Sequence, residues 1–153
     1  MRALYLKGQG MSKDETTHEP VEVRNACGTL RVVPFGEGRG VAALRPFRSG
    51  ELIERSPVIV VPEGDRAAVD ASSVGSHVFM WEHGTTGEDL YSSRGRAAVV
   101  LGFASLLNHS AEPNCRLVRH IEALAMDVIA IRDIAAGEEL RFDYNMTLWF
   151  EPL

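Results

Sequence analysis

Apolar residues in this chain come in short runs, and this limits the fold more than any other feature. From about residue 21 onward, glycine, proline or charged residues interrupt almost every run; the 153 residues include 14 glycines and 7 prolines. Strands of about five or six residues fit such spacing, whereas long amphipathic helices do not. The sequence therefore predicts a mostly β domain of the α+β class, built from many short strands.

The expected elements can be placed on the chain. Strands are predicted over 29–34, 40–44, 77–81, 115–120, 122–132 and 140–144, with turns at 49–50 and 135–140. A glycine-rich hinge is expected over 35–40, extended structure interrupted at Pro57 over 52–61, a short helix over 63–71, and a polar loop over 84–95. Residues 96–107 form a buried element that apolarity alone does not assign to helix or strand.

Length and charge suggest one domain and disfavour nucleic acid as its main partner. Residues 1–20 are polar and lack periodicity, so we expect a flexible leader followed by a domain over 21–153. The net charge is −5, with no block of lysine or arginine. Direct nucleic-acid binding is therefore not expected, since phosphate binding needs concentrated positive charge. An acidic surface tolerates a basic, lysine-rich peptide.

The protein is expected to be intracellular. Its composition, rich in Ala, Arg and Val, suggests a bacterial source, in which case the compartment would be the cytoplasm. No apolar run approaches the roughly 20 residues that cross a bilayer, and the stretch 3–6 is too short for the core of a signal peptide. Cys27 and Cys115 show no metal-ligand spacing. Each is interpreted as a buried or half-buried free thiol, and no metal site is expected.

Three further segments carry candidate chemistry. "GEGRGVAAL" (36–44) holds a Gly-x-Gly pair, which alone is an ordinary hairpin. "NHSAEPN" (108–114) follows an apolar run, and its polar groups are either a solvated turn or a site. "GEELRFDYN" (137–145) alone is a surface turn and a strand that ends in a tyrosine.

Together, in this order, the segments resemble the SET domain family of protein-lysine methyltransferases, most closely its minimal viral and bacterial members. The start pattern is "GRGVAALRPFRSGELI" (38–53), the central motif "NHSAEPN" and the closing motif "GEELRFDY" (137–144). The resemblance covers about residues 21–150. It implies a β-clip-type core of short strands and a C-terminal pseudoknot, in which the last segment passes under a loop.

The resemblance also implies roles for individual residues. Asn108 and His109 would bind S-adenosyl-L-methionine, mainly its adenine and amino groups, and residues 38–40 would approach it through backbone atoms. The residues so assigned to the cofactor are Gly38, Arg39, Gly40, Asn108, His109 and, as an aromatic cover beside Phe150, Trp149. Tyr144 would be the catalytic residue, chiefly by positioning the lysine amine, because a phenol is a poor base at neutral pH.

Two residues are assigned to the channel for the substrate lysine. Phe142 stands where the family carries Phe or Tyr, and Phe predicts methylation beyond the first methyl group. His77 stands where the minimal SET proteins usually carry a channel tyrosine; it either lines the channel or is an ordinary strand histidine, and Trp81 and Tyr91 are other candidates for that wall. An apolar channel would keep the lysine amine neutral.

Two alternatives remain open on the sequence. One is a SET-like module that binds S-adenosylmethionine or a peptide without turnover. The other is a different β-clip protein of the antifreeze-like, sugar-binding type. A homodimer is compatible with a bare SET core, which lacks the flanking modules that usually complete its surface.

Overall fold

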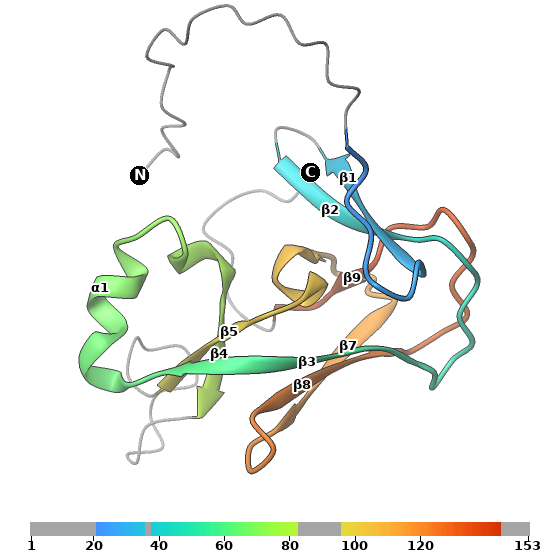
Figure 1. Cartoon of the computed structure of the whole chain (residues 1–153). Helices are drawn as coiled ribbons and strands as arrows, with labels where there is room; N and C mark the ends of the chain where they lie inside the picture. Colours follow the sequence, from blue (N-terminus) through green and yellow to red (C-terminus); the bar gives the residue numbers. More distant parts are fainter. Residues whose placement is uncertain (1–20, 36–37, 83–95, 145–153) are drawn as a thin grey trace, which may run out of the picture.

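The computed structural model describes residues 21–35, 38–82 and 96–144, which fold around one curled sheet (Figure 1). The strands are β1 (Leu30–Phe35), β2 (Gly38–Ala43), β3 (Leu52–Val61), β4 (Val78–Glu82), β5 (Arg96–Val100), β6 (Asn108–His109), β7 (Cys115–His120), β8 (Ala125–Ala130) and β9 (Arg141–Phe142). The helical pieces are η1 (Glu63–Asp65), α1 (Arg66–Asp70), η2 (Gly75–His77) and η3 (Phe103–Leu106). The predicted mostly β architecture is confirmed.

Seven strands form the sheet in the order β4-β5-β3-β8-β7-β9-β6, while β1 and β2 form a separate hairpin. The hairpin corrects the expected hinge over 35–40, because Phe35 pairs with Gly38 and Val33 with Gly40. Gly38 and Gly40 therefore belong to a strand. A bridge from Ala42 to Glu139 ties this hairpin to the segment that follows the turn at Gly137.

Strand β3 runs without a break through Pro57, where an interruption was predicted. Its first half pairs with β8 as far as Pro57 and Ala125, and its second half pairs with β5 from Val58 onward. Strand β5 ends at Val100. The missing N–H of Pro57 therefore falls at the end of the β3–β5 ladder, where no strand acceptor requires it.

The stretch 96–107 consists of two elements, β5 and η3, separated at Gly102. A Cβ atom at Gly102 would lie 2.0 Å from Ser56 Oγ on the neighbouring β3. The backbone approaches β3 so closely at this point that no side chain fits. The apolar pattern hides this boundary because both elements contribute buried residues.

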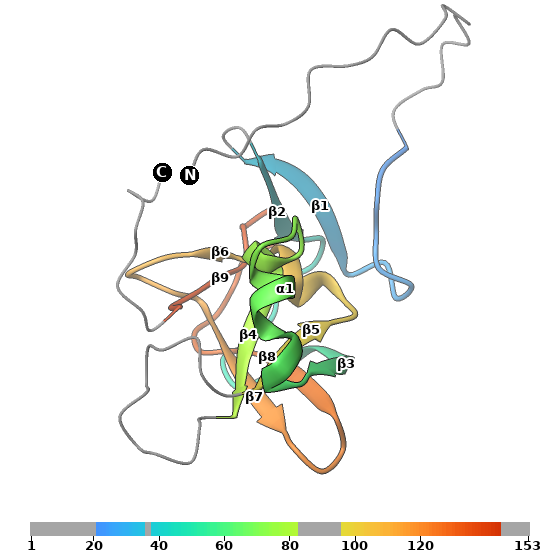
Figure 2. The ribbon, with the colours of Figure 1, turned by 90° about the vertical axis from the view of Figure 1, so that its left-hand side faces the viewer.

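Parallel pairing joins two segments about thirty residues apart in the chain. Asn108 pairs with Arg141 and His109 with Phe142, while β9 also meets β7 at Cys115. Figure 2 shows β6 and β9 side by side. The predicted threading of the last segment under a loop involves residues past Tyr144, which lie outside the described residues.

The core lies between the curled sheet, η3 and the hairpin. Its largest fully buried side chains include Trp81, Phe47, Leu30 and Met126. Cys115 is also buried, as predicted, whereas Cys27 is exposed and corrects the expectation of a buried thiol; it precedes Gly28, which turns with φ 65° before β1. Among the described residues, no helix is long and apolar enough to cross a membrane.

Candidate active site

The parallel crossing of β6 and β9 brings together residues of the central and closing motifs. The ring centroids of His109 and Tyr144 lie 5.3 Å apart in an edge-on arrangement, and those of Phe142 and Tyr144 lie 4.7 Å apart. Each strand contributes only two residues, so the pairing register alone decides which side chains meet.

The hydroxyl of Tyr144 is fixed by main chain. It donates a hydrogen bond to the carbonyl oxygen of Leu107 at 2.9 Å. Burial raises the pKa of this phenol above its ordinary value, so Tyr144 stays protonated at neutral pH. Because its only proton is given to Leu107, the oxygen keeps its lone pairs for another donor.

The protonation pattern of His109 follows from its neighbour. The backbone N–H of Tyr144 donates to His109 Nδ1 at 3.2 Å. An N–H group can only donate, so Nδ1 must carry a lone pair in this arrangement, and the ring proton sits on Nε2. Nδ1 also lies 3.8 Å from an Asp143 carboxylate oxygen, which is beyond hydrogen-bond reach. His109 therefore offers Nε2–H as a donor.

Asn108 is held in place by the closing motif and by the glycine strand. Its side-chain amide donates to Glu139 Oε1 at 2.8 Å and to the Arg39 carbonyl at 3.3 Å. A Cβ atom at Gly40 would lie 2.5 Å from the same Glu139 oxygen and 2.9 Å from Asn108 Nδ2. Glycine is thus required at 40 for the approach of these two side chains. Gly38, by contrast, is exposed.

The two carboxylates of the closing motif form hydrogen bonds within this region. The sequence-based interpretation of the motif as a surface turn did not predict these bonds. Glu139 Oε2 accepts two hydrogen bonds from the guanidinium of Arg141, at 2.6 and 2.9 Å. Glu138 accepts from Asn114, and Arg132 lies 2.7 Å away; these contacts hold the pKa of Glu138 below its ordinary value despite desolvation. The sequence gives no direct signal for these contacts, because Asn108 and Glu139 lie 31 positions apart and Asn114 and Glu138 lie 24 apart.

Asn114 is a buried residue whose side chain forms hydrogen bonds next to the crossing of β6 and β9. It is 2% exposed, and its side-chain oxygen accepts from the Arg141 backbone N–H at 2.8 Å while its amide donates to the Glu139 carbonyl at 2.8 Å. These bonds hold the segment 139–141 against Asn114, which directly precedes β7. The central motif at 108–114 therefore contains both candidate site residues and a structural asparagine, Asn114.

A carbonyl of η3 and that of the residue after it contact the predicted channel residue His77 and the predicted catalytic residue Tyr144. The Ser105 carbonyl lies 2.8 Å from His77 Nδ1, and the Leu107 carbonyl accepts from Tyr144. A carbonyl oxygen only accepts, so His77 must carry a proton on Nδ1 in this arrangement. The turn η3 itself is tied to β3, since the Ala104 N–H donates to Glu54 Oε2 at 3.2 Å.

Aromatic rings extend from Tyr144 toward β4 and could form the wall of the predicted lysine channel. The Phe79 and Phe142 ring centroids are 5.9 Å apart, and Phe142 is 8% exposed. His77 ends η2 just before β4, so it is not a strand residue. Trp81, another candidate for the wall, is fully buried near the end of β4. Trp149, Phe150 and Tyr91 lie outside the described residues.

This geometry belongs to a known fold class. A family model described as "SET domain" matches residues 38–145, and the chain belongs to the SET domain family. It is 28% identical to the histone-lysine N-methyltransferase, H3 lysine-37 specific, of Schizosaccharomyces pombe, over 75% of this chain and 71% of that protein. It is also 28% identical to N-lysine methyltransferase KMT5A-A of Xenopus laevis, over 72% of this chain and 34% of that protein.

A solved structure carries the same fold. The Neurospora SET domain protein DIM-5, a histone lysine methyltransferase, aligns with a TM-score of 0.56 at 18% identity, covering 81% of this chain and 55% of that one. The chain thus matches most of the fission-yeast relative but about a third of the Xenopus relative.

Proposed function

We propose that this chain transfers a methyl group from S-adenosylmethionine to the side-chain amine of a lysine in a protein. Membership of the SET domain family and relatives named as lysine methyltransferases support the reaction class. The observation that carries the proposal is the Tyr144 hydroxyl bound to the Leu107 carbonyl beside His109 and Phe142. This arrangement leaves an oriented oxygen acceptor in a half-buried aromatic setting.

The residues of β6 fit the cofactor because they offer both kinds of polar group. Among the described residues, Asn108 Oδ1 has no hydrogen-bond donor, whereas its amide nitrogen is engaged by Glu139 and Arg39. His109 offers Nε2–H. An acceptor beside a donor suits the edge of an adenine ring and an amino group, and the exposed backbone at Gly38 leaves room for close approach. Trp149 is proposed as the adenine cover.

The cofactor supplies a methyl group already activated on a sulfonium, so the chain has to align and desolvate the amine. The aromatic wall of Phe79 and Phe142 disfavours a charged ammonium and so favours the neutral amine. Tyr144 would accept a hydrogen bond from that amine through its free lone pair, which fixes the direction of the nitrogen. Main-chain carbonyls of η3 would add weak CH···O contacts.

Replacing Tyr144 by phenylalanine tests this proposal. We expect transfer of labelled methyl from S-adenosylmethionine to protein in lysate and to core histones to fall on the order of a hundredfold, because the oriented acceptor is lost while the ring remains. Calorimetric binding of the cofactor should persist. Tyr5→Phe, the same change in the N-terminal segment, is the matched control. Equal transfer by the Tyr144 variant and the native chain would contradict the assigned role.

Phe142 is proposed to set the number of methyl groups. Phenylalanine lacks the hydroxyl that tyrosine would use to hold a water beside the lysine nitrogen, so the product should proceed beyond monomethyllysine. Phe142→Tyr should shift the product toward monomethyllysine at similar total turnover. Mass spectrometry of an exhaustively reacted peptide measures this, and a native chain that stops at monomethyllysine would refute it.

A further inference from the structure

Strand β7 has a free edge, away from the residues assigned to methyl transfer. It pairs with β8 along its whole length, but on its other side it meets β9 only at Cys115. Residues 116–120 therefore have no strand partner on that side within the described part of the chain. Backbone groups of a strand point alternately to its two sides, so such an edge offers unpaired donors and acceptors.

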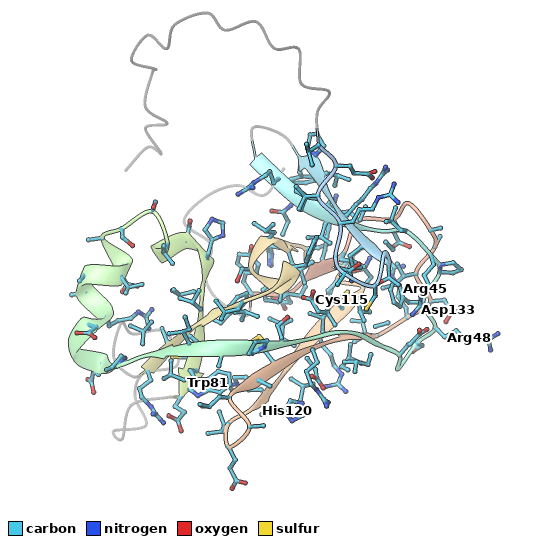
Figure 3. All side chains as sticks on the ribbon, viewed as in Figure 1. Arg45, Arg48, Trp81, Cys115, His120 and Asp133 are labelled. Carbon is cyan, nitrogen blue, oxygen red and sulfur yellow. The ribbon has the colours of Figure 1, made fainter. Side chains whose placement is uncertain are left out.

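An open groove of about 490 Å³ runs along this edge, toward the end of β4. Its walls are fixed, because the Arg119 guanidinium crosses to β4 and donates to the carbonyls of Met80 at 3.2 Å and Trp81 at 2.8 Å. Leu117 and the exposed Ile121 add apolar lining. Figure 3 places Trp81 and His120 low on the molecule, far from Arg48 at its other end.

The groove is positively charged in a chain whose net charge is −5. Arg116 and Arg119 both line it, and no carboxylate of the described residues pairs with either guanidinium. The one acidic lining residue, Glu82, already pairs with Arg96. An anionic partner would complement the two guanidinium groups.

We propose that the free edge of β7 binds an extended acidic segment of another protein as an added strand. Backbone hydrogen bonds to residues 116–120 would supply affinity, and carboxylates would pair with Arg116 and Arg119. These arginines are three positions apart and so lie on opposite faces of β7. A second copy of the same edge would bring arginine against arginine, which disfavours self-pairing. The interaction is independent of methyl transfer.

The probe is a short, capped peptide of threonine and valine that carries two glutamates three positions apart. Titrated into the isotope-labelled native chain, it should shift the backbone amide resonances of residues 116–120 in NMR spectra. Arg116→Glu should weaken binding about tenfold or more, since it turns an attraction into a repulsion. Arg48→Glu, the same change on an exposed arginine outside the groove, should not.

Two matched peptides sharpen the result. Lysines in place of the glutamates should abolish binding, and N-methylation of alternate backbone nitrogens should weaken it by removing strand pairing. Equal affinity for the lysine peptide, an unchanged affinity in Arg116→Ala as well as Arg116→Glu, or shifts confined to another surface would each overturn the proposal. So would a single-stranded oligonucleotide that shifts residues 116–120 when the glutamate peptide does not.

Discussion

Tyr144 and Cys115 show how burial acts on two weakly acidic side chains with different outcomes. Desolvation raises the pKa of both groups, and that of the Cys115 thiol reaches about 12. For Tyr144 the result is a neutral phenol whose oxygen can accept a hydrogen bond. For Cys115 the result is an inert thiol in the core, 1% exposed, although it follows the polar motif directly.

Alkylation separates the two cysteines. At pH 8 iodoacetamide should modify exposed Cys27 readily and leave Cys115 unmodified in the folded chain, because a buried thiol with a raised pKa supplies almost no thiolate. Peptide mapping by mass spectrometry measures both sites, and denatured chain provides the control in which both react. Equal labelling of the two in the folded chain would contradict the burial of Cys115.

Residue types reveal side chains but not the main-chain groups that hold them. The resemblance predicted that Asn108, His109, Phe142 and Tyr144 belong together, and the fold places all four at one strand crossing. The Leu107 carbonyl was beyond sequence reasoning, because every residue has a carbonyl and only the path of η3 aims this one. Glu139 was missed because a carboxylate after a glycine turn is usually solvated.

At the scale of elements, η3 and the residue that follows it supply the carbonyls that contact His77 and Tyr144. Glu54 attaches η3 to β3, through the Ala104 N–H. Glu54→Ala should lower the turnover number on the order of tenfold with little change in the KM for the cofactor, because the Ser105 and Leu107 carbonyls would shift.

The amide variant controls for this prediction. Glu54→Gln keeps an oxygen that can accept from Ala104 and should retain most of the activity. Loss of the charge-assisted bond in Glu54→Ala should also reduce the free energy of unfolding by about 1–3 kcal/mol, measured by urea titration. Stability that falls equally in both variants without any loss of turnover would show Glu54 to be purely structural.

The strands were more predictable than their boundaries. Alternating and β-branched residues located β1, β4, β7 and β8, since those patterns reflect burial on one sheet face. The hinge predicted over 35–40 and the break predicted at Pro57 were wrong for the same reason. Glycine and proline were taken to interrupt a strand, but pairing with a neighbouring strand keeps both segments extended. Pairing partners are not visible in a single segment.

At the scale of the whole molecule, one carboxylate ties three strands of the sheet. Asp127 on β8, 4% exposed, accepts two hydrogen bonds from Arg55 on β3, at 2.6 and 2.7 Å. His120 Nε2 on β7 lies 2.9 Å from the same carboxylate. These partners hold the pKa of Asp127 at about 2, against desolvation.

The contacts of Asp127 with Arg55 and His120 predict that the free energy of unfolding decreases in acid. In the unfolded chain Asp127 should titrate near its ordinary pKa of about 4, so its contribution is fully present above that pH. The contribution should fade as pH drops from about 4 toward 2, where the folded carboxyl also becomes protonated. Urea unfolding across this window measures it. Asp127→Asn should be less stable at pH 7 by about 1–3 kcal/mol and show a shallower acid slope; an unchanged slope would contradict this role of Asp127.

The parallel contact of β6 with β9 also has a consequence for synthesis on the ribosome. Asn108 and His109 emerge early, but the strand beside them and the tyrosine they adjoin are translated some thirty codons later. A nascent chain halted in that interval would hold only half of the proposed catalytic centre and should not modify neighbouring nascent proteins. Competence for the proposed methyl transfer should therefore arise abruptly, once β9 is free to insert beside β6.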